Sequence, residues 1–179
     1  MIAWKQVSAE VLYTAEPLSV VGAADVARFK EMAEHTPRRR LRLCTHAAPA
    51  DPLHEMLIVA GRDGYIAPHR HLARPESFLV VEGGADAVFF TDDGAVARVV
   101  RMGPYGDGGA FYYRIDHAQY HTLLLRTPWL VFIEASLGPF DPSRSQFAPW
   151  APAEGDEAGI RRFREAVEAE VAEWGRREA

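Results

Sequence analysis

The sequence contains a single cysteine, Cys44, among its 179 residues. One cysteine cannot form a disulfide within the chain, and a chain of this length can bury a hydrophobic core without one. An excess of basic residues is also absent, because the formal net charge is −5 at pH 7. That balance argues against broad nucleic-acid binding, which needs a basic surface to displace counterions.

Long apolar runs are missing as well. No stretch of the chain reaches the roughly 18 uninterrupted apolar residues that a membrane-spanning helix requires. Residues 1–6 show no basic segment followed by an apolar core, which is the pattern of a signal peptide. We therefore expect a cytoplasmic protein without a membrane or nucleic-acid partner.

The remaining pattern indicates one domain made of four segments. A short helix is predicted over residues 25–35, where apolar residues repeat at helical spacing between a capping Asp25 and Pro37. The expected segments are an N-terminal extension with this helix, a β-barrel, a strap rich in proline and aromatic residues, and a C-terminal helix: 1–37, 38–137, 138–155 and 156–179.

Short apolar runs separated by turn sequences fill residues 38–137. Gly-Arg-Asp-Gly at 61–64 and Asp-Asp-Gly at 92–94 are typical of tight turns. Roughly eight to ten strands follow, with no helical pattern between them, which favours an antiparallel sandwich or barrel over a parallel βαβ sheet. The predicted strands are 40–45, 55–60, 65–71, 77–82, 86–91, 96–102, 111–115, 121–125 and 130–135.

The C-terminal part is expected to cover the barrel. Phe140, Phe147 and Trp150 make the proline-rich strap too aromatic for a plain linker, so we expect them to pack on the barrel. The helix that follows has one apolar stripe, which either covers its own domain or forms the contact of a homodimer. The stripe consists of Ile160, Phe163, Val167, Val171 and Trp174.

His69 and His71 lie two residues apart in a predicted strand, so their imidazoles point to the same side. Such a pair is weak evidence alone and needs structural context. Glu76 supplies that context, because it opens the next apolar strand, where an inward carboxylate is costly unless it is paired or metal-bound. Imidazole and carboxylate together suit a divalent transition metal, and iron, manganese, nickel and zinc all accept them.

His121 is the fourth candidate ligand. It opens the apolar run 122–125, and a histidine at such a position is, taken alone, more typical of a hydrogen-bonded core residue. In combination with the other three residues, in a β-rich chain, we favour a metal ligand. His117 is the main competitor, and the sequence leaves open whether it supports the site or is simply exposed.

The segment from Gly64 to Gly83 resembles the first cupin motif, which is a glycine, His-x-His, a glutamate and a second glycine. Gly64 stands one residue closer to the histidines than in the commonest spacing. The second cupin motif, Pro-x-Gly-x-x-His and then asparagine, is matched only at His121, and Leu125 stands where the asparagine falls. The resemblance implies an all-β cupin barrel (double-stranded β-helix or jelly roll) that binds metal through the four residues above.

A wider set of segments, over roughly residues 25–155, resembles the WbuC family of cupin-fold metalloproteins. The most specific of them are Gly-Pro-Phe-Asp-Pro at 138–142 and Phe-Ala-Pro-Trp-Ala-Pro at 147–152. The WbuC family is associated with bacterial gene clusters for surface polysaccharide (O-antigen) biosynthesis. The resemblance therefore implies a fold and a metal, and leaves the reaction open.

Further polar residues could line the site. Glu134 stands in the apolar run 130–135, either at the wet end of a strand or pointing into the barrel, where it could act as a general base or orient a ligand histidine. His46 either lines the site or merely ends a strand. Tyr65 and Arg114 are weaker candidates, and for Arg114 an exposed ion pair is favoured.

Arginines cluster at residues 38–40 and at Arg42. We favour a solvated strand edge, since runs of charge usually face water. The alternative is that these arginines meet an anionic ligand near one end of the barrel.

Two classes of function fit these features. Three histidines and a carboxylate leave open positions on a metal that prefers six ligands, which suits an isomerase, epimerase or dioxygenase acting on a small polar molecule. Glu134 and His46 are the catalytic candidates, and a sugar or sugar nucleotide as substrate follows from the family association alone. The alternative is a metal-dependent module that binds or senses a small-molecule ligand without turnover. An inward Glu134 or His46 near the metal would favour the enzyme.

Overall fold

The computed structural model describes residues 2–178, in which twelve β-strands, two α-helices and one 3-10 helix are found. The helices and most barrel strands lie close to their predicted positions. The helices are α1 (Ala23–Glu34), η1 (Pro142–Arg144) and α2 (Glu157–Glu178). The strands are β1 (Trp4–Ser8), β2 (Val11–Thr14), β3 (Arg40–Cys44), β4 (Leu53–Gly61), β5 (His69–His71), β6 (Glu76–Glu82), β7 (Ala85–Phe90), β8 (Val96–Met102), β9 (Tyr112–Ile115), β10 (Tyr120–Leu125), β11 (Trp129–Leu137) and β12 (Ser145–Phe147).

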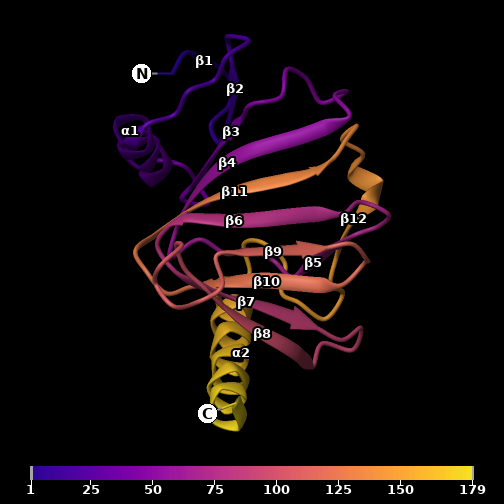
Figure 1. The fold of residues 1–179 in the computed structure, drawn as a ribbon. Helices are drawn as coiled ribbons and strands as arrows, with labels where there is room; N and C mark the ends of the chain where they lie inside the picture. Colours follow the sequence, from indigo (N-terminus) through magenta and orange to yellow (C-terminus); the bar gives the residue numbers. More distant parts are fainter. Residues whose placement is uncertain (1, 179) are drawn as a thin grey trace.

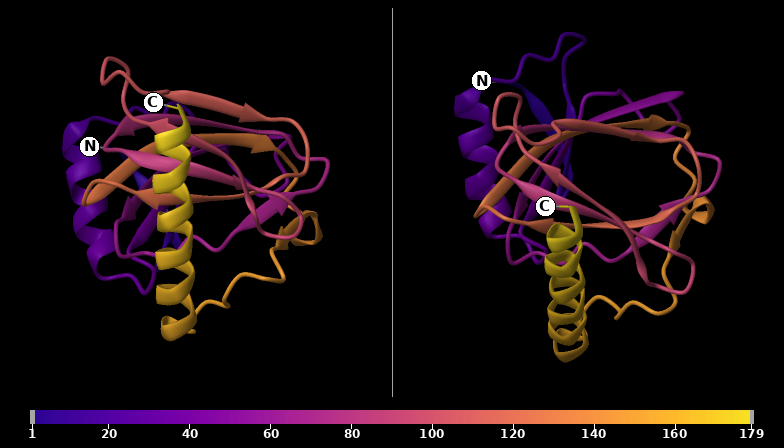
Figure 2. Two further views of the ribbon diagram at one scale, coloured as in Figure 1. Left: turned by 90° about the horizontal axis from the view of Figure 1, so that it is seen from below. Right: turned by 60° about the horizontal axis from the view of Figure 1, so that its bottom comes forward.

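The strands form two sheets that face each other and enclose a barrel (Figure 1, Figure 2). The order is β1-β2-β3-β4-β11-β6-β9 in the larger sheet and β12-β5-β10-β7-β8 in the smaller one. Paired strands are antiparallel except β2 and β3, which run parallel. The predicted antiparallel all-β barrel, with one helix towards each end of the chain, is confirmed.

The larger sheet is covered on both faces near β3. Side chains alternate along a strand, and Leu41 and Leu43 point outward to pack under α1 with Phe29 and Ala33. Cys44 belongs to the other face and joins the apolar core inside the barrel. Helix α1 lies outside the barrel wall, as Figure 2 shows. The apolar side of β3 therefore faces a helix, and its other side faces the barrel interior.

Helix α2 lies against the outer face of the smaller sheet (Figure 1). Val167, which is 3% exposed, packs with buried residues of β7 and β10. Phe163 and Val171 of the same stripe, and Trp150 of the strap, pack against this cluster. The stripe thus covers its own domain, the first of the two interpretations. Neither α-helix of the described chain has the length and hydropathy of a membrane-spanning helix.

The sequence does not predict β1 and β2, which lie in the N-terminal extension. β1 is an edge strand whose residues after Trp4 are all exposed, so no apolar alternation marks it. β2 buries Leu12 completely and extends the larger sheet next to β3. Strands of four or five residues, one of them largely polar and exposed, are too short for a periodic signal and are defined by their pairing.

The strap also differs from the prediction. Its residues Ser145–Phe147 form β12, which pairs with β5 and becomes an edge strand of the smaller sheet. Of the three strap aromatics, only Trp150 packs on the barrel, because Phe140 and Phe147 are 52% and 66% exposed. Both of these phenylalanines instead line the cavity of the barrel, at its open rim.

Candidate metal centre

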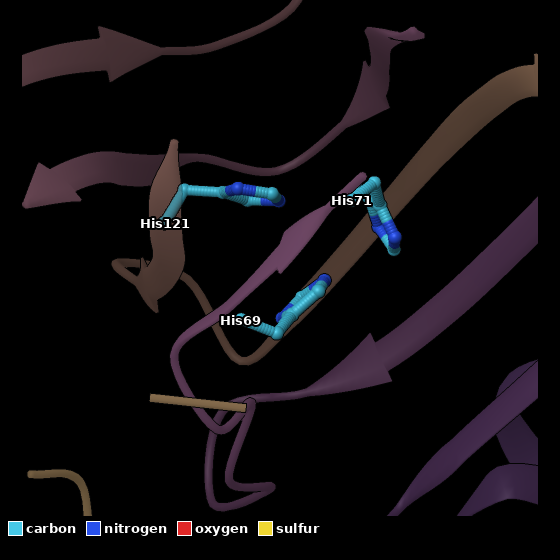
Figure 3. A group of neighbouring side chains, drawn as sticks. All are labelled: His69, His71 and His121. Carbon is cyan, nitrogen blue, oxygen red and sulfur yellow. The ribbon is translucent and has the colours of Figure 1, made fainter. Parts of the chain in front are cut away.

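Three histidines converge inside the barrel from two adjacent strands. β5 carries His69 and His71, and His121 of β10 pairs directly with His69 across the two strands. One ring nitrogen of each histidine lies within 4.8 Å of those of the other two. Figure 3 shows the three rings pointing toward a common centre. The cluster has the composition and spacing of a site for a divalent metal ion.

The Nδ1 atoms of His69 and His121, which we call their outer nitrogens, form hydrogen bonds with backbone carbonyl oxygens. The Nδ1 of His69 lies 2.9 Å from the carbonyl oxygen of Ala67, and that of His121 lies 3.0 Å from the carbonyl oxygen of Gln119. A carbonyl oxygen can only accept, so both Nδ1 atoms carry a proton and donate it. Each Nε2 is then left with a lone pair for a metal ion.

His71 is held from the strap. Its Nδ1 lies 3.1 Å from the hydroxyl oxygen of Ser145 in β12. The pairing of Ser145 with His71 across β12 and β5 places the two side chains on the same face. The strap thus supplies the outer partner of one candidate ligand.

Glu76 reaches the histidines from the opposite sheet. Its Oε1 lies 2.9 Å from Nε2 of His121, and its Oε2 lies 3.1 Å from Nε2 of His71. Neutral His121, with its proton on Nδ1, presents a lone pair to a carboxylate oxygen that also carries lone pairs. Two such acceptors approach this closely only when they share a cation, either a proton or a metal ion. The donor set therefore fits a divalent metal ion.

The pKa values of the cluster show the same sharing of a cation between Glu76 and His121. Burial opposes the charged form of His121, but its hydrogen bond to Glu76 outweighs burial and raises the pKa of this imidazole. Burial lowers the pKa of His69 to about 3, so this ring is neutral at physiological pH. Burial opposes the charge of Glu76, but hydrogen bonds with His121 and His71 outweigh it and hold the pKa of this carboxyl well below its usual range. A neutral imidazole and an ionised carboxylate are the protonation states that bind metal.

The cluster opens into a cavity of about 430 Å³ between the two sheets. Strand register orders the residues that the larger sheet contributes to the interior into successive rows. Starting from the metal centre, the rows run Glu76, Ser136, His54; then Phe78, Glu134, Met56, Cys44; then Val80, Phe132, Ile58, Arg42; then Leu130, Ala60, Arg40.

Glu134 points into the barrel, one row beyond Glu76, and lines this cavity. Of the two orientations left open by the sequence, the inward one is found. Burial and the neighbouring charge of Glu76 raise the pKa of Glu134. A raised pKa brings a carboxyl closer to the range in which it can accept and return a proton.

His46 also lines the cavity and is buried. Its ring stacks on that of His54 with centroids 4.0 Å apart, and its Nδ1 lies 3.2 Å from the carbonyl oxygen of Glu55. Burial lowers the pKa of His46. No sequence signal singles out His54, since a histidine near the start of a predicted strand is not specific to a site.

The remaining candidates divide between the cavity and the surface. His117 is exposed, its side chain bonds to neighbouring Asp116, and it does not line the cavity. Arg114 lies 3.7 Å from Asp116 in an exposed ion pair, as favoured. Tyr65 lines the cavity, and burial raises its pKa to about 12.

For the arginine cluster at residues 38–42, the preferred interpretation as a solvated strand edge is only partly right. Arg38 and Arg39 are 46% and 40% exposed in their side chains and pair with acids, as a solvated edge would. Arg40 and Arg42, however, line the cavity, as does the paired Arg38. Arg74, which no sequence feature singles out, lines it as well. The alternation of arginine and leucine over residues 40–43 indicated a strand with one charged and one apolar face. The apolar face packs against α1, so the charged face lies inside the barrel.

Comparison with known proteins supports the fold. Residues 21–102 match a family model described as "Domain of unknown function (DUF6016)". No curated protein sequence matches the chain. The matched segment includes the His-x-His pair and Glu76, and ends before His121.

Several solved structures are similar. A conserved protein with a double-stranded β-helix domain from Klebsiella pneumoniae is 14% identical, with a TM-score of 0.51 over 73% of this chain and 98% of that one. A protein from Shewanella oneidensis is 9% identical, with a TM-score of 0.52 over 72% and 85%. A cupin 2 conserved barrel domain protein from Rhodopseudomonas palustris is 16% identical, with a TM-score of 0.48 over 72% and 77%. At these identities the likeness is one of fold, the double-stranded β-helix that is named for the Klebsiella pneumoniae protein.

Proposed function

We propose that this chain binds one divalent transition metal ion through His69, His71, Glu76 and His121, and uses it to act on a small polar molecule. The observation that carries the proposal is the convergence of three histidine nitrogens and a buried carboxylate from opposite sheets. Outer partners for all three histidines support it, because a built metal site fixes the orientation of its ligands.

Iron, manganese, nickel and zinc are all compatible with nitrogen and oxygen donors. When bound, such an ion supplies Lewis-acid polarisation of a substrate oxygen, or activation of dioxygen in the case of iron. The protein's own contribution is to hold the four donors rigidly between two sheets. The cavity beside them then excludes bulk water from whatever molecule enters it.

The reaction class we favour is that of an isomerase or epimerase, or of a dioxygenase. Glu134 is the proposed proton-transfer residue, because it faces the same cavity as the metal centre and has a raised pKa. His46 is the second candidate, because it lines the same cavity. An acid and a histidine facing one cavity favour turnover over mere binding.

The substrate we propose is a sugar or sugar-nucleotide derivative in surface-polysaccharide metabolism. This part rests on the resemblance to the WbuC family in the segments at 138–142 and 147–152. The cavity volume of about 430 Å³ is in keeping with a small molecule of that kind.

Metal content tests the site. We expect wild-type protein purified without oxygen to contain about one metal ion per chain, and His71→Ala to lose most of it. His71→Ala should still unfold cooperatively, because the apolar core does not depend on the ion. His117→Ala is the matched control, since that histidine is exposed and away from the cavity. Wild-type metal content in His71→Ala would contradict the site.

Turnover is tested separately. Glu134→Gln should keep its metal and lose at least about tenfold in rate on any substrate found by screening sugars and sugar nucleotides. If ligands bind in a metal-dependent way and none is converted, the chain is a binding or sensing module.

A further inference from the structure

Two arginines of β3 point into the barrel. Arg40 and Arg42 line the cavity, whereas Leu41 and Leu43 between and after them pack outward beneath α1. Helix α1 covers the apolar face of this strand on the outside of the barrel. Because side chains alternate along a strand, the charged face points into the interior. Two guanidinium groups are thereby placed inside the barrel, beyond the row of Glu134.

Neither guanidinium forms an ion pair within the part of the protein that the structure describes. Among residues 2–178, no carboxylate lies within ion-pair distance of Arg40 or Arg42, and the buried Nε of Arg42 makes no hydrogen bond. The neighbouring Arg38, which also lines the cavity, differs, since its Nε donates to Glu10 at 2.7 Å. Beside Arg42 lies the thiol of Cys44, whose pKa is raised by burial, so it supplies no negative charge.

Most of the other charged groups that line the cavity are paired with one another. Arg38 pairs with Glu10 and Glu154, and Glu76 with two histidines. Arg74 adds a third guanidinium, which donates to the carbonyl oxygen of Leu137 at 2.8 Å and to the hydroxyl of Ser136 at 2.7 Å rather than to an acid. Of the carboxylates in the lining, only Glu134 is then left to oppose Arg40, Arg42 and Arg74, and it forms no ion pair with any of the three. Holding cations without an ion pair in a partly buried site costs stability, which points to a functional role for them.

We infer that the cavity takes a small organic anion whose carboxylate or phosphate group is bound by Arg40 and Arg42 while its other end faces the metal centre. The guanidinium fork matches both of these anionic groups, with two parallel hydrogen bonds. This inference rests on the proposed function for the metal end of the ligand only. The anionic class of the substrate follows from Arg40 and Arg42, which take no part in holding the metal.

Strand geometry sets the size of the molecule. The rows of Glu76 and Arg42 are four residues apart along the sheet, or about 13 Å between their backbones. Side chains extending from both rows shorten this distance, which leaves room for roughly one sugar ring. Glu134 stands in the intervening row, beside the middle of such a ligand. A sugar acid or a sugar phosphate has the required length, with its anionic group at one end.

Binding to three matched probes tests the inference. Glucose, glucuronate and glucose 6-phosphate present a similar ring with no charge, a carboxylate or a phosphate. We expect calorimetric titration of metal-loaded protein to show binding of at least one of the two anions at millimolar concentration, and none of glucose. The two anions together distinguish carboxylate from phosphate recognition. Equal affinity for glucose, or no binding of either anion, would overturn the inference.

Variants locate the anion. Arg40→Gln and Arg42→Gln should each weaken binding of the favoured anion by about tenfold to a hundredfold, the range for a lost charge-assisted hydrogen bond. Arg98→Gln is the matched control, because Arg98 is an exposed residue of the outer strand β8 and should leave affinity unchanged. Anion affinity in Arg42→Gln equal to that of wild type would overturn the assignment.

Two further measurements separate a ligand role from a structural one. Arg42→Met removes an unpaired buried cation, so the ligand-free variant should melt at or above the wild-type temperature, and a marked fall would show that Arg42 supports the fold instead. Metal content is measured on every sample. Wild type without metal would defeat the proposed function, while arginine-dependent anion binding to the same sample would still support the inference.

Discussion

Ser145 connects the strap to the candidate metal centre, because its hydroxyl lies 3.1 Å from Nδ1 of His71. The corresponding partners of His69 and His121 are backbone carbonyl oxygens, which substitution cannot remove. Ser145→Ala therefore deletes an outer partner of the centre without touching a ligand. Metal affinity should fall, since the His71 ring loses the contact that fixes its orientation.

The size of the effect follows from the type of contact. Loss of the outer hydrogen-bond partner of a metal-binding histidine weakens metal affinity by about 10- to 100-fold. That range corresponds to roughly 1.4–2.7 kcal/mol of binding free energy. Folding stability should change less, by about 1 kcal/mol, because Ser145 lies on an edge strand and loses one neutral hydrogen bond.

Competition with a chromophoric chelator measures this affinity directly. Ser145→Thr keeps a hydroxyl and should retain most of the wild-type affinity. Ser143→Ala is the control from the same segment, because that hydroxyl bonds to Asp141 at 2.7 Å and is exposed. Wild-type affinity in Ser145→Ala, or an equal loss in Ser143→Ala, would refute the reasoning.

Three further predictions concern the barrel. Because burial raises the pKa of Glu134, the stability of the metal-free protein should fall as pH rises from 4.5 toward the folded-state pKa. Urea unfolding should thus show Glu134→Gln more stable than wild type near pH 7.5 and not near pH 4, and a pH-independent difference would contradict this. Val167→Ala should cost about 1–3 kcal/mol of unfolding free energy by thermal or urea denaturation, and Val7→Ala, which is 60% exposed, close to nothing. Gly83→Ala would place a Cβ 2.1 Å from the carbonyl oxygen of Trp129 and should cost several kcal/mol, whereas Gly106→Ala, also at positive φ but in open space, isolates the smaller strain of about 1–3 kcal/mol.

The barrel and the four converging residues could be predicted because their signals are local. Alternation of apolar residues marked most strands, and His69, His71 and Glu76 lie within one hairpin. The position of His121 could not be predicted from local sequence alone, because its strand pairs with β5 only in the folded barrel. The match to the second cupin motif favoured His121 over His117 as the fourth ligand. Of these two residues, only His121 lines the cavity.

Arg40 and Arg42 show why the rest could not be predicted. Alternation shows that a strand has two different faces, but it does not show which face lies inside. The usual rule puts the apolar face inside, and here α1 takes that face on the outer wall of the barrel. The decision depends on a helix that comes before the strand in sequence and packs against it only after folding.

The strap and the N-terminal strands illustrate a second limit. β1 and β12 are edge strands of three to five residues, and pairing rather than composition defines them. Phe147 was expected to cover the barrel because it is aromatic. It lies instead at the rim of the cavity, since its position in β12 is set by register with His69.

X-ray absorption spectroscopy on the metal-loaded protein tests the central claim most directly, because imidazole ligands give a characteristic multiple-scattering signal. We predict nitrogen and oxygen donors with the signal of three imidazoles in wild type, and of two in His121→Ala loaded with the same metal. A metal bound without imidazole scattering, or a spectrum that His121→Ala leaves unchanged, would contradict the assignment of these side chains to a metal ion.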